Sequence, residues 1–260
     1  MADLTRRRTL RTFALLSSAW AIRGKAAVND ATTSGKKLKV VVVGAHPDDP
    51  ESSCGGTMAR YADLGHDVVA LYLTRGEAGI PGKSAQEAAR IRTAEAQRAC
   101  SILKARPVFA GQIDGRTELN DARYAEFRAI IEAQNPDVVF APWPIDSHRD
   151  HRAASLLSYD AWERSSRRFE FYYTEVDVGG ETKNFQPTHY VDITNVVERK
   201  RQACLAHDSQ DHGRFYAQYH ETMQRFRGLE YRCHAAEAFV SLFQGPQANS
   251  LPGPAAPLTR

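Results

Sequence analysis

Two short polar segments of the sequence carry the side-chain types that bind metals and transfer protons. They are His46-Pro-Asp-Asp49 and His148-Arg-Asp-His151, which together hold three histidines and three carboxylates. Catalytic zinc sites use three protein ligands, commonly His with Asp or Glu, and leave one position open to water. We therefore predict a site for one divalent metal, zinc, made by His46, Asp49 and His151.

The remaining groups in these segments suit proton transfer and charge stabilisation. Asp48 would stand beside the open position and accept a proton from a water molecule activated by the metal. His148 would stand across the substrate carbonyl and stabilise the negative oxygen that develops there. Asp150 could accept the second ring N–H of a histidine and so fix its tautomer. This chemistry is hydrolysis of an amide or a similar bond.

The two segments follow runs that are typical of buried strands. We expect strands at 39–44, 68–73, 107–110 and 137–141, with two more near 169–174 and 188–192. Between and after them the pattern favours helices, at about 57–64, 84–104, 121–134, 152–165, 195–206 and 211–226. Strands that alternate with helices indicate βαβ units and an α/β domain with a mostly parallel sheet. Such sheets bind ligands beyond the carboxyl ends of their strands, which is where both polar segments fall.

Composition excludes several classes of protein. The chain has 260 residues, of which 42% are hydrophobic and 25% charged, with a mean hydropathy of −0.48. No apolar run approaches the roughly 20 residues that span a bilayer. The net charge of +3 comes from residues 1–27, which carry six basic groups and one acid, and the remainder has 28 basic and 30 acidic groups. A basic surface for nucleic acid is therefore not predicted. The four cysteines show no spacing that identifies a pair.

The first 27 residues have the features of an export signal. Arg7-Arg8 precedes an apolar stretch at 13–22, which Arg23 and Lys25 follow. Paired arginines before a modest apolar segment are typical of twin-arginine signals. We expect cleavage near residue 26 or 27 and a periplasmic or extracellular protein. At the other end, residues 244–260 are rich in proline and glycine and are predicted to be a loose tail.

Further segments support a family resemblance. Residues 45–57, Thr74-Arg-Gly-Glu77 and 148–151 together resemble the PIG-L/LmbE-like family of zinc-dependent N-deacetylases. Weaker matches lie at 90–95, 207–210 and 236–239, and the resemblance covers about 38–243. It implies a single Rossmann-like domain with helices on both faces of the sheet. It also implies removal of acetyl groups from N-acetylglucosamine-type substrates with one divalent metal.

The resemblance assigns the same roles as the chemistry did. It makes His46, Asp49 and His151 the metal ligands, Asp48 the general base and His148 the oxyanion-stabilising histidine, with Asp150 in support. Two departures are modest. Pro50 stands where an acid often follows the two aspartates, with Glu51 one place later, and Arg149 stands where proline is frequent. Neither departure removes a ligand.

Other residues carry weaker assignments. Arg75 and Asp114 match family positions that face sugar hydroxyls or an anionic group, although a salt bridge from Arg75 to Glu77 and a simple Asp-Gly turn at Asp114 explain them equally. His207 lies in a matching segment, but no role follows from its pattern. The remaining histidines lack paired ligand spacing and are predicted to be structural.

The sequence therefore predicts an exported zinc hydrolase that deacetylates an N-acetylated amino sugar or glycoconjugate. Its expected partner is a small-molecule or glycan substrate, and homo-oligomerisation is left open. Two alternatives remain. The enzyme could cleave another amide, such as a thiol conjugate or a glycopeptide, or the chain could be a non-catalytic sugar-binding relative.

Overall fold

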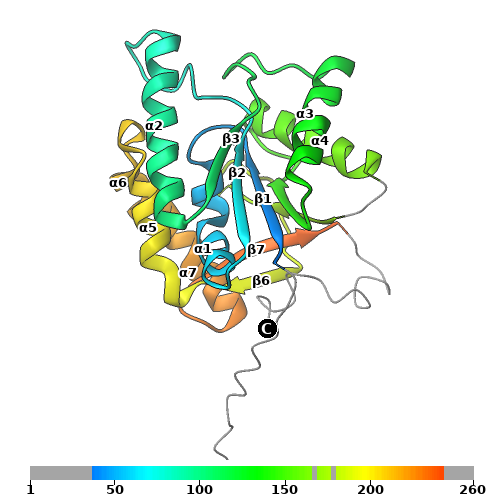
Figure 1. The fold of residues 1–260 in the computed structure, drawn as a ribbon. Coiled ribbons are helices and arrows are strands. Elements are labelled where there is room, and N and C mark those ends of the chain that lie inside the picture. Colours follow the sequence, from blue (N-terminus) through cyan, green and yellow to red (C-terminus); the bar gives the residue numbers. More distant parts are fainter. Residues whose placement is uncertain (1–36, 166–168, 177–179, 243–260) are drawn as a thin grey trace, which may run out of the picture. The chain divides into compact units, whose positions relative to one another are not determined.

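Strands and helices alternate through most of the chain (Figure 1). This computed structural model describes residues 37–165, 169–176 and 180–242. The strands are β1 (Lys39–Gly44), β2 (Asp67–Tyr72), β3 (Arg106–Phe109), β4 (Val138–Pro142), β5 (Glu170–Thr174), β6 (His189–Asp192) and β7 (Ala236–Ser241). The helices are α1 (Asp49–Asp63), α2 (Ala85–Leu103), α3 (Asp121–Gln134), α4 (Arg149–Arg164), α5 (Val197–Leu205), α6 (His212–Phe215) and α7 (Glu221–Tyr231). Shorter turns are η1 (Thr194–Val196), η2 (Asp208–Gln210) and the π-helical η3 (Tyr216–His220). The predicted leader and tail lie outside the described residues.

The described strands form one sheet in the order β3-β2-β1-β4-β5-β7-β6. The first five in that order pair in parallel, and β7 runs antiparallel to both β5 and β6. This arrangement confirms the predicted α/β class with a mostly parallel sheet. From β1 the chain adds β2 and then β3 toward one edge of the sheet, and from β4 it adds β5 toward the other edge. A ligand crevice is expected where the direction reverses, at the carboxyl ends of β1 and β4.

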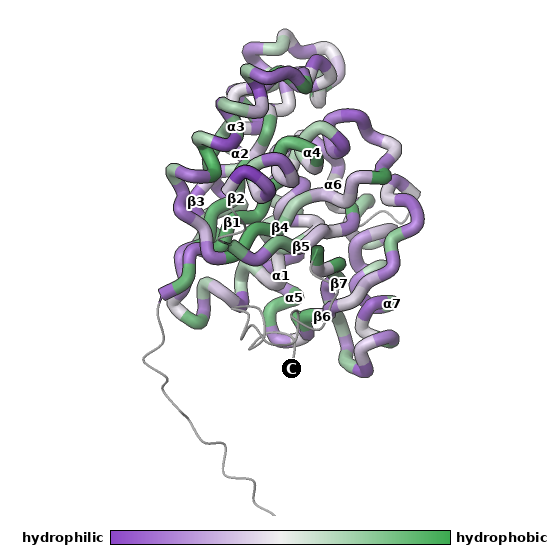
Figure 2. The backbone as a smooth tube through the Cα atoms, turned by 90° about the vertical axis from the view of Figure 1, so that its right-hand side faces the viewer, coloured by the Kyte–Doolittle hydropathy of each residue, from purple (hydrophilic) through white to green (hydrophobic). Residues whose placement is uncertain are grey.

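Helices cover both faces of the sheet, as predicted. In β1, Val40 and Val42 face a core cluster that includes residues of α1 and α2, whereas Val41 and Val43 face a cluster that includes residues of α3 and α4. All four valines are at most 1% exposed, so β1 is buried on both sides. Figure 2 shows the apolar colouring concentrated on the central strands. A strand buried on both faces is a rigid base for the residues that follow it.

Local sequence explains where several elements begin and how they pack. Ser84 caps α2 by accepting a hydrogen bond from the backbone N–H of Glu87 at 3.2 Å, as its capping pattern predicts. Gly56 lets α1 approach the segment after β6, because a Cβ atom there would lie 2.5 Å from a side-chain carbon of Ile193. Deeper in, Lys200 of α5 pairs with Glu237 of β7 at 2.8 Å, and both side chains are at most 1% exposed.

Two further features concern the helices and the cysteines. None of the helices in the described residues combines the length and the apolar character needed to cross a bilayer. None of the four cysteines, all of which lie in the described residues, forms a disulfide; three are buried and Cys233 is partly exposed.

Candidate metal and catalytic site

The turn after β1 is fixed by Asp49. Its Oδ2 atom accepts hydrogen bonds from the backbone N–H groups of Ala45 at 2.7 Å and His46 at 2.8 Å. Gly44 is required at the end of the strand, because a Cβ atom there would lie 2.6 Å from side-chain carbons of both Asp49 and Pro50. The turn therefore closes tightly and directs His46 and Asp49 into the same space.

Asp49 contacts the rings of both predicted histidine ligands. Its Oδ2 atom lies 3.5 Å from Nδ1 of His46, and its Oδ1 atom lies 3.5 Å from Nε2 of His151. His151 comes from the first turn of α4, about a hundred residues along the chain. Burial raises the pKa of Asp49, but His151 and His46 outweigh it and hold the pKa well below its usual value. The structure thus brings together the three residues predicted to bind the metal.

The second nitrogen of each ring faces another carboxylate. Nε2 of His46 lies 3.2 Å from Asp114 Oδ1 and 3.3 Å from Asp150 Oδ2. Nδ1 of His151 lies 3.1 Å from Asp146 Oδ1. Metal-binding histidines commonly donate their other ring N–H to a carboxylate in this way. Asp150 and Asp146 therefore lie where carboxylates that orient ligand histidines lie, and the supporting role of Asp150 stays a prediction.

The histidine nitrogens and carboxylate oxygens that meet at this site suit a divalent metal. His46, His148 and His151 each offer one ring nitrogen, and these three nitrogens lie within 4.8 Å of one another. Two further groups in the described residues meet the same spacing, and each shares a histidine with this cluster. They are His46, Asp114 and Asp150, and Asp146, His151 and Glu181. Imidazole nitrogens mixed with carboxylate oxygens are donors that Zn²⁺ accepts.

His148 caps the start of α4 through its ring. Its Nδ1 atom accepts a hydrogen bond from the backbone N–H of Asp150 at 3.2 Å, which places the remaining ring proton on Nε2. Burial lowers the pKa of this half-buried histidine, and the neighbouring His46 and His151 lower it further. A neutral ring is therefore favoured near pH 7, and it can still donate a hydrogen bond through Nε2–H.

Asp150 is built into the wall of the site. Its side chain is fully buried and accepts hydrogen bonds from Thr117 Oγ1 at 2.6 Å and from the Gly115 backbone N–H at 2.7 Å. Burial raises the pKa of this carboxyl, but the hydrogen bonds from His46, Thr117 and Gly115 outweigh it, and the pKa lies far below its usual value. Asp150 is therefore an anion at neutral pH and favours a ring N–H directed toward it.

Asp48 lines a cavity of about 460 Å³. Its Oδ2 atom is 2.8 Å from a guanidinium nitrogen of Arg92, in an ion pair that sequence reasoning missed. The cavity is lined by residues from several segments: His46, Asp48, Asp49, Ser52, Ala78, Gly79, Arg92, Asp114, Gly115, His148, His151, Val176, Glu181, Gln210, Phe215 and His220. The predicted base and the histidine cluster thus share one space of the size that small ligands occupy.

The two predicted substrate contacts differ in position. Asp114 lines the cavity, but one of its oxygens already faces His46 and the other accepts the Ala78 N–H at 3.1 Å. Arg75 is not among the lining residues. Its guanidinium donates to Thr93 Oγ1 at 3.0 Å and stacks 4.3 Å from the ring centre of Phe109. Contact between Arg75 and a substrate stays a prediction.

Sequence reasoning missed several residues of the site. Asp146 had a usable signal, since it precedes His148 in the same polar loop after β4. Arg92 lies in the matching segment 90–95, but its helix gave no sign of contact with Asp48. His220, which was predicted to be structural, is 3% exposed and lines the cavity. Long-range packing of α2 and η3 places the last two, and local spacing does not reveal it.

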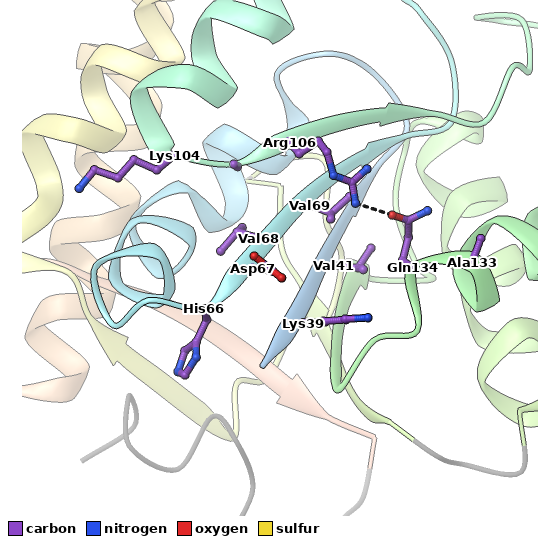
Figure 3. A pocket seen from close by; sticks show the side chains of 11 residues that line it. Lys39, Val41, His66, Asp67, Val68, Val69, Lys104, Arg106, Ala133 and Gln134 are labelled. Carbon is purple, nitrogen blue, oxygen red and sulfur yellow. Dashed lines mark hydrogen bonds between the residues drawn. The ribbon is translucent and has the colours of Figure 1, made fainter. Parts of the chain in front are cut away.

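A second cavity of the described residues, also about 460 Å³, lies at the opposite, amino end of β1 and β2 (Figure 3). Its cationic side chains do not converge on a common point. Figure 3 shows Lys39 and Lys104 pointing to opposite sides. Lys104 pairs with Asp63 at 3.3 Å, and Arg106 donates to Gln134 at 2.7 Å. This cavity therefore lacks the arrangement of a charged-ligand site.

Comparisons with known proteins agree with this geometry. A family profile described as "PIG-L: GlcNAc-PI de-N-acetylase" matches residues 41–162. The diacetylchitobiose deacetylase of Thermococcus kodakarensis is 32% identical over 66% of this chain and 70% of its own. The 1D-myo-inositol 2-acetamido-2-deoxy-alpha-D-glucopyranoside deacetylase of Rhodococcus erythropolis is 34% identical over 50% of this chain and 47% of its own. The crystal structure of a conserved protein from Thermus thermophilus superposes with a TM-score of 0.70. It is 30% identical and covers 79% of this chain and 95% of that one.

Proposed function

The chain belongs to the PIG-L family of N-deacetylases, and we propose that it removes the acetyl group from an N-acetylated amino sugar or glycoconjugate. Hydrolysis of the amide bond of an acetylated sugar is the activity that its relatives' names share. One observation carries the proposal for this chain. Asp49 contacts both His46 and His151 while Asp48 and His148 line the same cavity.

The residues that would hold the metal are His46, Asp49 and His151, and zinc is the ion we propose. Nδ1 of His46 and Nε2 of His151 are the ring atoms that face Asp49, and their opposite nitrogens face carboxylates. A bound divalent ion would supply Lewis-acid activation of water and polarisation of the substrate carbonyl. The paired carboxylates Asp150 and Asp146 would keep both rings oriented toward it.

The chain's own residues account for the proton transfers. Asp48 would accept a proton from the water that attacks the acetamide carbonyl carbon. Nε2–H of His148 would donate a hydrogen bond to the carbonyl oxygen as negative charge develops on it. The proton held by Asp48 would then pass to the departing nitrogen as the carbon–nitrogen bond breaks. The products are acetate and a free amine.

Acetate release tests this function. The full chain, loaded with about one zinc ion, is incubated with a panel that contains diacetylchitobiose, N-acetylglucosamine and an N-acetylglucosaminyl inositol. We expect acetate from at least one sugar, and we expect a chelator to stop its release. Bound zinc without acetate from any sugar would indicate a different amide as substrate. No zinc binding and no acetate would refute the catalytic proposal.

Export is a separate proposal that rests on the sequence of residues 1–27. We propose that the twin arginines direct the chain out of the cytoplasm. Fractionation of cells that express the full chain should recover it outside the cytoplasm, and replacement of Arg7 and Arg8 by lysine should retain it inside. Equal distribution of the two proteins would contradict the proposal.

A further inference from the structure

Asp48 has a backbone conformation that ordinary residues avoid. Its φ angle is 123°, a value that places the Cβ atom in steric conflict for any residue other than glycine. Such conformations persist only where the surrounding structure holds them, and they gather at functional sites. The proposed base therefore needs partners that fix both its backbone and its carboxylate.

Arg92 supplies both contacts from a distant part of the chain. It lies on α2, is 3% exposed, and places a guanidinium nitrogen 2.8 Å from Oδ2 of Asp48. The same nitrogen donates to the backbone carbonyl of Pro47, the residue just before Asp48. One buried guanidinium thus contacts the peptide unit that enters the strained residue and also the side chain of that residue.

The position of Arg92 is itself constrained by two glycines. A Cβ atom on Gly76 would lie 2.5 Å from Cδ of Arg92, and a Cβ atom on Gly79 would overlap its guanidinium. Gly76 has a φ of 71°, whereas Gly79 is not in the left-handed region. An alanine at Gly79 would therefore change the space around Arg92 without forcing the local backbone into strain.

Helix α2, which carries Arg92, is hydrogen-bonded to the segment 207–210, which has no assigned role. Glu95, one turn after Arg92, accepts hydrogen bonds from the backbone N–H and hydroxyl of Ser209 at 2.8 and 2.7 Å. Gln210 donates to the Gly79 carbonyl at 3.1 Å. The segments 90–95 and 207–210, which had only a family resemblance to explain them, therefore meet beside the Arg92–Asp48 contact.

We propose that Arg92 is the positioning residue for Asp48, holding its carboxylate in the orientation that proton transfer from water requires. The inference rests on the proposed function, in which Asp48 is the base. The two N–H bonds of the Arg92 guanidinium nitrogen that makes both contacts lie in a fixed plane, so one can point to the carboxylate and the other to the carbonyl, whereas a lysine ammonium is a rotating point charge. Displacement of a reacting group by about 1 Å can reduce the rate about a hundredfold.

The kinetic test compares variants of two arginines on the same helix. Arg92→Lys and Arg92→Met should lower kcat by about 10- to 100-fold, with KM and zinc content changed less than about twofold. Gly79→Ala should lower kcat in the same way while every charge is retained. Arg98→Met is the matched control, because Arg98 forms an exposed ion pair with Asp208 at 3.0 Å and is not among the residues that line the cavity. Its kcat should equal that of the wild type.

A structural readout keeps the inference testable whatever the substrate is. A crystal structure of Arg92→Met should show the Asp48 carboxylate moved from its wild-type place, with Asp49 unmoved. An unmoved Asp48 carboxylate, or folded Arg92 variants with wild-type kcat, would overturn the inference. Failure of the wild-type enzyme to release acetate would instead count against the proposed function, and the crystal structure would still decide the role of Arg92.

Discussion

Nδ1 of His151 lies 3.1 Å from Oδ1 of Asp146, and this contact sets the direction in which the opposite ring nitrogen points. That opposite atom, Nε2, faces Asp49. Asp146 also accepts the His148 backbone N–H at 2.7 Å, so a single buried carboxylate organises the loop before α4 and one proposed ligand. The proposed metal site therefore depends on a carboxylate outside the proposed ligand set of His46, Asp49 and His151.

Removal of Asp146 should weaken metal binding without unfolding the protein. Loss of a carboxylate that orients a ligand commonly reduces metal affinity about 10- to 100-fold. We expect Asp146→Ala to show that reduction in a competition titration with a chromogenic chelator. Asp160→Ala, in the last turns of α4 where Asp160 pairs with Arg164 at 3.5 Å, serves as the control and should bind zinc as the wild type does. Equal zinc affinity in the two variants would show that Asp146 does not orient His151.

Zinc affinity should increase with pH. Burial disfavours the charged ring of His151, but Asp49 and Asp146 outweigh it and raise its pKa to about 10 in the metal-free protein. A metal ligand must be deprotonated, so binding releases a proton at every pH below that pKa. The apparent affinity should therefore rise about tenfold per pH unit for each proton released, between about pH 6 and pH 8. Competition titrations across this range measure the slope, and a flat profile would contradict the protonated state of His151.

Replacement of Asp48 by asparagine should separate catalysis from metal binding. Asparagine preserves the shape of the side chain but does not accept the proton, and general-base catalysis contributes about 10²- to 10⁴-fold. We expect kcat to fall by that factor while zinc content stays at the wild-type level. Asp208→Asn, whose side chain is 77% exposed, is the control. A variant at Asp48 with unchanged turnover would remove this residue from the mechanism.

The sequence was sufficient to predict the parallel part of the fold and the histidines that gather at the candidate site. Runs such as 39–44 are apolar and β-branched, so they predict buried strands, and the motifs after them fall where parallel sheets place ligands. The last strand, β7, was missed. Its sequence, Ala236-Glu-Ala-Phe-Val-Ser, includes a charged residue, and burial of Glu237 is explained by contacts with Lys200 of α5 and with backbone N–H groups of α1. A pairing between distant residues leaves no local periodicity.

Contacts between distant residues also limited what the sequence could predict about the site. The proximity of His46, Asp49 and His151 was predictable because each lies in a short polar segment at a strand end. Arg92 and Asp146 act through contacts that depend on how helices and loops pack, so their roles required coordinates. The packing of α2 against the turn after β1 is the kind of information that residue spacing does not contain.

The buried ion pair between Lys200 and Glu237 should matter for stability. Both side chains are at most 1% exposed, and Glu237 also accepts the backbone N–H groups of Gly56 and Thr57 at 2.8 and 2.7 Å. Lys200→Met would leave the carboxylate buried without its cation, which typically costs about 3–5 kcal/mol. Lys83→Met is the matched control, because Lys83 pairs with Glu87 at 2.7 Å on the surface. Its effect should stay below about 1 kcal/mol. Urea unfolding measures both, and equal losses would refute the argument.

Gly56 tests how closely α1 must approach the segment that follows β6. A Cβ atom at this position would lie 2.5 Å from one side-chain carbon of Ile193 and 2.7 Å from another, so Gly56→Ala forces the two elements apart. Overpacking of this kind costs about 1–3 kcal/mol, even though alanine favours a helix more than glycine does. Gly213→Ala is the control, since nothing lies within 4 Å of a Cβ atom there.

The steric cause can be separated from any effect on the helix backbone by a compensating change. Ile193→Ala removes Cγ2, the atom that would lie 2.5 Å from the new methyl group, so Gly56→Ala should cost less in an Ile193→Ala background than in the wild type. Urea unfolding of the two single variants and the double variant gives the coupling. Additive losses would mean that Ile193 is not the obstacle, and that the glycine serves the backbone of α1 alone. A favourable coupling would establish that contact between α1 and Ile193 limits the residue at position 56.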